Sequence, residues 1–185
     1  MTEILFKGNL GIAYTQFYIE VAHDDLADSE VELVTSVKWF KGQENGLCGA
    51  SEKGKLSFVP GVHMGTIALT IELHDSIPTM DETFEEVVEV SFQAGEKPIS
   101  LCEWAHETTH RLKIPQADYR VRYSAHGMDL ENEYEDEEEE LEEEPPVPGQ
   151  KYLIQLWPCS QRSPDKIVKQ TSKNASYWHE SKLGK

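Results

Sequence analysis

The sequence predicts an all-β protein, an antiparallel β-sandwich of about seven or eight strands with an acidic loop insert and a polar C-terminal tail. Three observations predict this class. Short segments alternate apolar and polar side chains with the period of two that is typical of half-buried strands, turn residues separate these segments, and no long amphipathic helix pattern occurs. A β-barrel is the alternative, because periodicity alone does not distinguish it from a sandwich.

Four strands are expected in the N-terminal half, where β-branched and aromatic residues alternate with polar ones. They are residues 10–21, 30–39, 56–59 and 66–73. The segment 56–59 is short and suggests an edge strand, whereas 66–73 is expected to be central because both of its faces can be covered. Residues 41–55 show neither period and are expected to form a loop.

The C-terminal half adds strands at 84–92 and 151–157, and an apolar segment at 99–104 that fits several structures. Between them, residues 110–129 predict a hairpin. Pro115 cannot donate a backbone hydrogen bond, so one strand should end near Ile114 and the next should begin near Tyr119. Arg120 and Arg122 alternate with apolar neighbours, so we expect them to face solvent or to pair with carboxylates.

The charge is concentrated in one segment. The chain of 185 residues has a formal net charge of −17, and residues 131–144 hold 11 of its 34 acidic residues and no basic one. Without this insert the net charge is −6. We expect one β-sandwich domain at 1–157 with the acidic insert at 131–144, and a tail at 158–185 that packs on the domain or extends from it.

An acidic surface repels the phosphates of nucleic acids and of anionic lipids, so direct binding to DNA, RNA or a membrane is not expected. No apolar run has the length of a membrane span, and the N-terminus lacks the pattern of a signal peptide. The three cysteines are too few and too scattered for a disulfide framework. A cytoplasmic protein is therefore expected. Since phosphate-loop and nucleophile-elbow motifs are absent, no cofactor and no catalytic residue are assigned.

One formal catalytic motif occurs at residues 106–110, which read HETTH. On a helix, HExxH places His106 and His110 one turn apart, where both can bind zinc while Glu107 activates a bound water. The helix is poorly supported, because Thr108 and Thr109 are β-branched and a proline follows closely. A zinc-dependent hydrolase therefore stays an alternative, and no metal ligand is assigned.

The acidic insert has three interpretations. It could be a solvated loop, a weak cation site without the Gly and Asn spacing of a calcium loop, or a docking surface for a basic protein. Tyr134 and Leu141 within the run favour contact with a partner. We therefore predict a partner-binding segment, made of the consecutive acidic residues Glu135, Asp136, Glu137, Glu138, Glu139 and Glu140.

Four segments carry a family resemblance: residues 10–20, 88–92, 111–123 and 151–157. Tyr14-Thr15-Gln16-Phe17 and Ile114-Pro115-Gln116-Ala117-Asp118-Tyr119 are the most specific of its motifs. In this order they resemble the competence protein J family over about residues 10–157. The resemblance implies an inhibitor of a DNA-entry nuclease. The acidic insert and the added tail depart from that family, so no functional residue is carried over.

The end of the chain is also similar to a set of uncharacterised bacterial proteins, through Tyr-Leu-x-Gln-x-Trp-Pro at 152–158 and Tyr-Trp-His at 177–179. Together, charge and resemblance predict a protein-binding module that neutralises a basic nuclease or toxin by covering its cationic groove. An accessory protein with a purely structural role is a further alternative to the zinc hydrolase. The partner expected is a basic protein.

Overall fold

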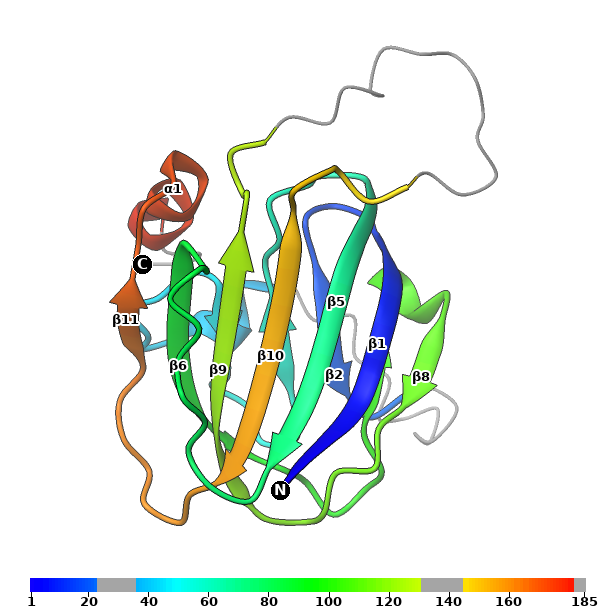
Figure 1. Ribbon diagram of the computed structural model, residues 1–185. Coiled ribbons are helices and arrows are strands. Elements are labelled where there is room, and N and C mark those ends of the chain that lie inside the picture. Colours follow the sequence, from blue (N-terminus) through cyan, green and yellow to red (C-terminus); the bar gives the residue numbers. More distant parts are fainter. Residues whose placement is uncertain (23–35, 131–144, 182–185) are drawn as a thin grey trace.

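The structure is a computed structural model that describes residues 1–22, 36–130 and 145–181 (Figure 1). Its strands form two sheets that lie one behind the other. In spatial order, the six-stranded sheet contains β1 (Thr2–Ile12), β5 (Gly65–His74), β10 (Lys151–Pro158), β9 (Asp118–His126), β6 (Glu86–Gln93) and β11 (Lys166–Lys169). The five-stranded sheet contains β3 (Cys48–Gly49), β4 (Leu56–Phe58), β2 (Phe17–Glu20), β7 (Ser100–Cys102) and β8 (Thr109–Arg111).

The prediction of a largely β protein is confirmed, but the prediction of a purely antiparallel one is wrong. β5 and β10 are neighbours that run parallel, with Tyr152 beside Leu69 and Leu156 beside Leu73. Alternation of apolar and polar residues does not report direction, because strands of either direction point successive side chains to opposite faces. The described residues form eleven strands, more than the seven or eight expected. Several have only two to four residues, too few to show a period.

The hydrophobic core lies between the two sheets. β5 buries Ile67, Leu69 and Ile71 on its inner face, while its other face stays half-exposed, so the expectation that both faces are covered is wrong. Across the core, the rings of Phe58 and Tyr123 lie 5.2 Å apart between centroids. The Tyr123 hydroxyl donates to the Val59 carbonyl at 3.2 Å, so burying this ring leaves no polar atom without a partner.

The expected strand at 10–21 is two strands in different sheets. β1 already begins at Thr2, and β2 follows after a tight turn in which Tyr14 and Thr15 have positive φ angles of 55° and 58°. In the sequence the alternation runs on through the turn residues, so the pattern does not mark the point where the chain reverses. The strand at 56–59 is β4, which has neighbours on both sides and is not an edge strand.

The expected strand at 30–39 does not occur in the part of this range that the structure describes, residues 36–39. Residues 30–35 lie outside the described residues, and Ser36–Phe40 form a 3₁₀ turn, η3. Trp39 and Phe40 are adjacent and both buried, at 5% and 6% exposure. Successive residues of a strand point to opposite faces, whereas a turn can bury two neighbours against one core.

The predicted hairpin at 110–129 is wrong in its pairing, because its two strands belong to different sheets. β8 pairs with β7, and Leu112 extends this pairing by donating its N–H to the Ile99 carbonyl at 3.0 Å. β9 pairs with β10 and β6. Pro115 therefore lies in a connection between sheets, where its carbonyl accepts the Tyr119 hydroxyl at 2.8 Å.

Arg120 and Arg122 pair with a carboxylate and do not face solvent. Both are buried on the outer face of β9, and Glu89 of β6 accepts from Arg122 Nη2 at 2.8 Å and from Arg120 Nε at 3.4 Å. Carbonyls from flanking segments complete the arrangement, since Pro78 accepts from Arg122 and Pro164 from Arg120. The segments after β5 and after β10 thus cover this part of the sheet.

The last described residues add an edge strand and a helix. β11 pairs antiparallel with β6, and α1 (Lys173–Ser181) follows. Asp129 accepts the N–H groups of Lys173 and Asn174 at 2.9 and 2.8 Å, which satisfies two donors at the start of α1. No helix in the described part of the chain is long and apolar enough to cross a membrane.

Candidate protein-binding surface

The predicted partner-binding residues, Glu135 to Glu140, lie outside the described residues. The strands on either side of the insert show where it attaches. β9 ends and β10 begins at the same end of the six-stranded sheet, with His126 beside Lys151. β1 ends and β5 begins at this end of the sheet too, with Ile12 beside Gly65 (Figure 1). The insert therefore leaves and re-enters the sheet at the end that carries the β1–β2 turn.

The β1–β2 turn has an unusual backbone for its residues. Ala13 and Gln16 form an isolated antiparallel bridge, and the two residues between them both have positive φ. A turn of this kind normally takes Asn or Gly, because a Cβ atom is unfavourable at positive φ. Here the positions hold Tyr14 and Thr15. Such backbone outliers cost of order 1–3 kcal/mol each and persist where surrounding contacts hold them.

His63 provides those contacts. Its carbonyl accepts the Thr15 N–H at 3.0 Å, and its Nδ1 lies 3.1 Å from the Thr15 hydroxyl. The Tyr14 ring packs on the Trp104 ring at 4.8 Å between centroids, and its contact with the His63 ring at 5.8 Å is edge-on. Three segments far apart in the sequence therefore meet at this turn.

Trp104 comes from a second turn with an unusual backbone. In the segment between β7 and β8, which contains the 3₁₀ turn η4 (Trp104–His106), Ala105 and His106 have φ of 52° and 58°. Glu103 anchors this segment to β1, because its Oε1 accepts the Gly11 N–H at 2.9 Å. Within the described residues, the only non-glycine residues with positive φ are those of this turn and of the β1–β2 turn.

The HETTH segment does not form the helix that a zinc protease requires. His106 lies in the turn and His110 lies on β8, so the two imidazoles are not on one helical face. His106 Nε2 lies 2.8 Å from Glu20 Oε1, with both side chains nearly buried, and the His110 ring packs on Phe6. In the described ranges, no group of three or more His, Cys, Asp or Glu residues is placed to hold a metal ion.

The buried thiols have a structural role and no sign of activation. Cys48 and Cys102 are buried and unpaired. Burial raises the pKa of the Cys102 thiol to about 12, with a further contribution from the nearby Glu20 carboxylate. Burial also raises the pKa of Cys48. A nucleophilic cysteine needs a lowered pKa, so neither residue is suited to that role.

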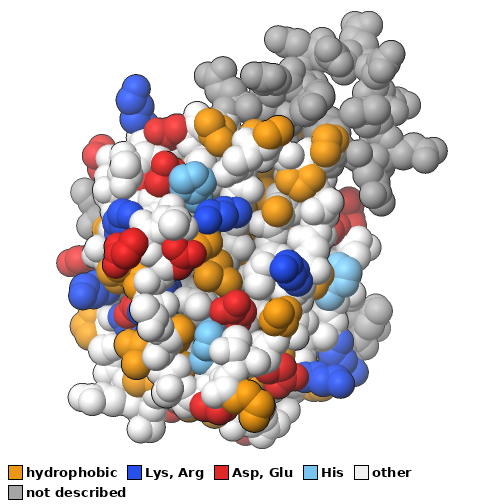
Figure 2. Space-filling view, in the orientation of Figure 1, with side chains coloured by type: hydrophobic (Ala, Val, Ile, Leu, Met, Phe, Trp, Pro, Cys, Tyr) orange, Lys and Arg blue, Asp and Glu red, His pale blue; other side chains and the backbone are white. Residues whose placement is uncertain are grey.

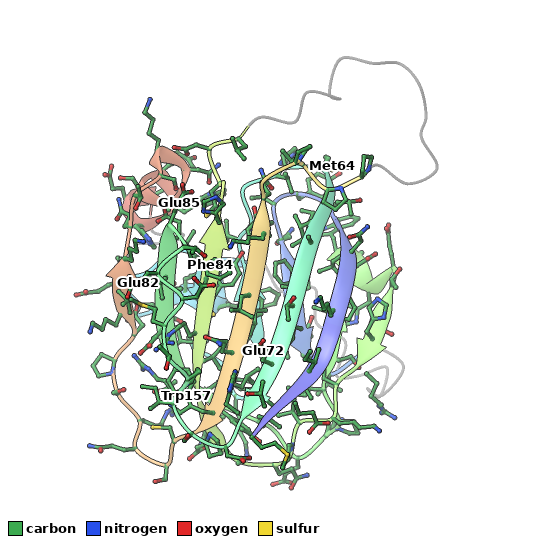
Figure 3. The ribbon with its side chains drawn as sticks, in the orientation of Figure 1. Met64, Glu72, Glu82, Phe84, Glu85 and Trp157 are labelled. Atoms are coloured by element: carbon green, nitrogen blue, oxygen red, sulfur yellow. The ribbon has the colours of Figure 1, made fainter. Side chains whose placement is uncertain are left out.

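We name the group at this end the aromatic patch, formed by the exposed Tyr14, His63 and Met64 and the half-buried Trp104. Tyr14 is 56% exposed and Met64 is 49% exposed, and Figure 3 shows Met64 just before the start of β5. Tyr, Trp and Met are enriched in the anchoring positions of protein interfaces. A partly exposed aromatic cluster on strained turns is a candidate binding surface, because its exposed side chains contribute little to the hydrophobic core.

Sequence reasoning missed this patch. The expected strand at 10–21 puts Tyr14 in its middle, and Trp104 ends the apolar segment 99–104, which fits several structures. The residues are 40 to 90 positions apart in the sequence except for the adjacent His63 and Met64, and no local pattern joins them. The Tyr14-Thr15-Gln16-Phe17 motif of the family resemblance covers the turn itself and was the one available signal.

Comparison with known proteins shows a shared fold. No protein-family model and no curated protein sequence matches the chain. Among solved structures, the chain is similar to ComJ from Bacillus subtilis, an inhibitor of the DNA-degrading activity of NucA. The TM-score is 0.54 at 18% identity, over 86% of this chain and 99% of ComJ. It is also similar to the product of crocagin biosynthetic gene J, with a TM-score of 0.51 at 16% identity, over 85% of this chain and 98% of that one. The resemblance to competence protein J is therefore confirmed at the level of the fold.

Proposed function

We propose that this chain is a protein-binding module that inhibits a basic nuclease. The observation that carries the proposal is the aromatic patch, in which the exposed Tyr14 ring packs on the half-buried Trp104 ring and both residues lie on strained turns. The fold shared with ComJ, described as an inhibitor of NucA, supports it. In this proposal the two sheets act as a sandwich that holds the patch rigid.

The proposed mechanism combines attraction and anchoring. The acidic residues 135–140 attract the cationic groove with which a nuclease holds its substrate, which raises the association rate. The rings of the aromatic patch then exclude water from the contact and slow dissociation. DNA is displaced because the module occupies the same groove. Three free cysteines fit a protein of the cytoplasm, and that location is part of the proposal.

Complex formation with a purified nuclease tests the proposal. The nuclease should degrade DNA, carry a positive net charge and be encoded in the same genome. It is immobilised, this chain is added at increasing concentrations, and binding is measured by interferometry. Lysozyme is the matched control, because it is basic and does not act on DNA. We expect saturable binding to the nuclease and much weaker, salt-abolished binding to lysozyme. Equal binding to both would mean that charge alone drives association, which would overturn the proposal.

A further inference from the structure

One half of the outer face of the six-stranded sheet is uncovered. The segments after β5 and after β10 lie over β9 and β6, but no described helix or strand covers β1, β5 and the adjoining part of β10 (Figure 1). A groove of about 500 Å³ follows this face. Phe84, from the segment after β5, forms its wall on the β9 side (Figure 3). Small-molecule sites have volumes of roughly 300–1,000 Å³, so the groove has a suitable size.

The floor and walls of the groove are partly apolar. Ala68 of β5 and Leu153 of β10 lie on the floor. Ile4 of β1 also lines the groove and is 58% exposed. Exposed apolar side chains that meet in a concave surface can be covered by the apolar part of a ligand, which releases water. The space-filling view shows such side chains beside lysines on this face (Figure 2).

Two lysines supply positive charge. Lys7 lies on β1 directly beside Thr70, and within the described residues its ammonium has no hydrogen-bond or ion-pair partner. Lys151 lies across the groove, where its Nζ donates to Thr83 Oγ1 at 3.0 Å and lies 4.6 Å from the centre of the Phe84 ring. Lys7 is therefore the cation that a ligand can reach without breaking an existing contact.

The carboxylates of the groove are already engaged. Glu72 lies 2.9 Å from His74 Nε2 and accepts from Gln155 Nε2 at 3.0 Å. Asp81 accepts the Thr83 N–H at 2.9 Å and also its hydroxyl. Both carboxylates are therefore occupied by donors within the protein. An anion in the groove meets the unpaired Lys7 ammonium beside an apolar floor.

We infer that this groove binds an amphipathic organic anion, a molecule with one carboxylate and an apolar body. The carboxylate pairs with the Lys7 ammonium, and the apolar body lies over Ala68 and Leu153 against the Phe84 ring. A polyanion does not fit, because the chain carries a net charge of −17 and repels a long row of phosphates. A single carboxylate makes one short-range contact and meets little of that repulsion, which salt screens beyond about 8 Å.

Titration calorimetry with decanoate, kept below its micelle concentration, tests the inference. Decylammonium has the same alkyl chain with the opposite charge and is the ligand control. We expect saturable binding of decanoate at one site, and no binding or at least tenfold weaker binding of decylammonium. Comparable affinity for both ligands would show that this face binds alkyl chains whatever their charge, and the inference would be overturned.

Two variants locate the site. Lys7→Met keeps the length of an exposed side chain and removes its charge, so decanoate affinity should fall about tenfold. Lys53→Met removes a lysine that is also exposed, from a turn outside the groove, and should leave the affinity unchanged. Ala68→Phe fills the floor and should abolish binding, while a native circular dichroism spectrum shows that it folds. Unchanged affinity in Lys7→Met and Ala68→Phe would place the ligand elsewhere and contradict the assignment.

Discussion

At the scale of single residues, Tyr14 and Thr15 occupy backbone conformations that Asn or Gly would adopt with less strain. Replacing them would stabilise the turn, so their presence indicates that the side chains serve another purpose. Thr15 has a structural role through its two contacts with His63. Tyr14 has no such bond, and more than half of its surface is exposed. This exposed ring makes Tyr14 a candidate contact for the proposed partner.

Replacing Tyr14 by Ala should weaken partner binding with little effect on stability. The ring is an exposed anchor, so its loss should raise the dissociation rate about tenfold or more, while the free energy of unfolding changes by less than about 1 kcal/mol. Tyr177→Ala is the matched control, because Tyr177 is 62% exposed but lies on α1. Interferometry and urea denaturation measure both quantities. Equal effects of the two variants on dissociation would remove Tyr14 from the interface.

Glu89→Gln should destabilise the fold strongly. This carboxylate pairs with Arg120 and Arg122, which are 7% and 5% exposed, and its loss leaves two buried guanidinium groups without their counter-ion. Breaking a buried pair in this way typically costs about 3–5 kcal/mol. Glu82→Gln is the control, since Glu82 is exposed on the neighbouring segment. Urea denaturation of both variants gives the difference, and a loss below about 1 kcal/mol for Glu89→Gln would contradict this account.

At the scale of elements, the sequence predicted most strands of the six-stranded sheet and few of their partners. Residues 66–73, 84–92 and 151–157 correspond closely to β5, β6 and β10, because each has enough alternating residues to show its period. Pairing depends on contacts between distant segments, so the parallel β5–β10 neighbours and the separation of β8 from β9 had no local signal. The aromatic patch was unpredictable for the same reason, since three distant turns assemble it.

Acidification should loosen the docking of α1. His179 on α1 is 5% exposed, and its Nδ1 accepts the Gly46 N–H at 2.9 Å. Burial lowers its pKa from the usual 6.5, although nearby Asp165 opposes this shift. The neutral ring is therefore favoured in the folded state. Its contribution to stability is present above pH 6.5 and is lost as the pH falls through the lowered pKa.

Hydrogen exchange of the Gly46 amide measures this effect. Its protection factor should decrease as the pH is lowered from 6.5 through the lowered pKa of His179, because the protonated ring can no longer accept the bond. In His179→Gln, whose amide oxygen can accept the same N–H without titrating, the protection factor should not change with pH. A wild-type protection factor that is constant over this range would show that His179 does not control the contact.

At the scale of the whole molecule, the strand ends that flank the acidic insert and the aromatic patch lie at the same end of the six-stranded sheet. The insert that holds 11 of the 34 acidic residues connects β9 and β10 at the end of the sheet that carries the β1–β2 turn. Composition alone predicted the charge, while its position relative to the patch depends on the fold. In the account proposed above, the insert accelerates association and the patch slows dissociation, so the two contributions can be separated kinetically.

Replacing residues 131–144 by a neutral Gly-Ser linker of equal length should lower the association rate with a basic nuclease. At low salt we expect a decrease of about tenfold or more, which disappears as salt screens the charges. The dissociation rate should stay within about twofold of the wild type, in contrast to Tyr14→Ala. Association and dissociation rates across a salt series give the answer. If the replacement changed only dissociation, the insert would be part of the anchored contact instead.

The central claim is that the aromatic patch carries inhibition of a nuclease. The most direct measurement is the rate of DNA degradation by that nuclease, titrated with the wild-type chain and with the Tyr14→Ala/Trp104→Ala double variant. We predict that the wild type stops degradation near an equimolar ratio. The double variant should remain folded and require a large excess. Full inhibition by the double variant at the same ratio as the wild type would contradict the claim.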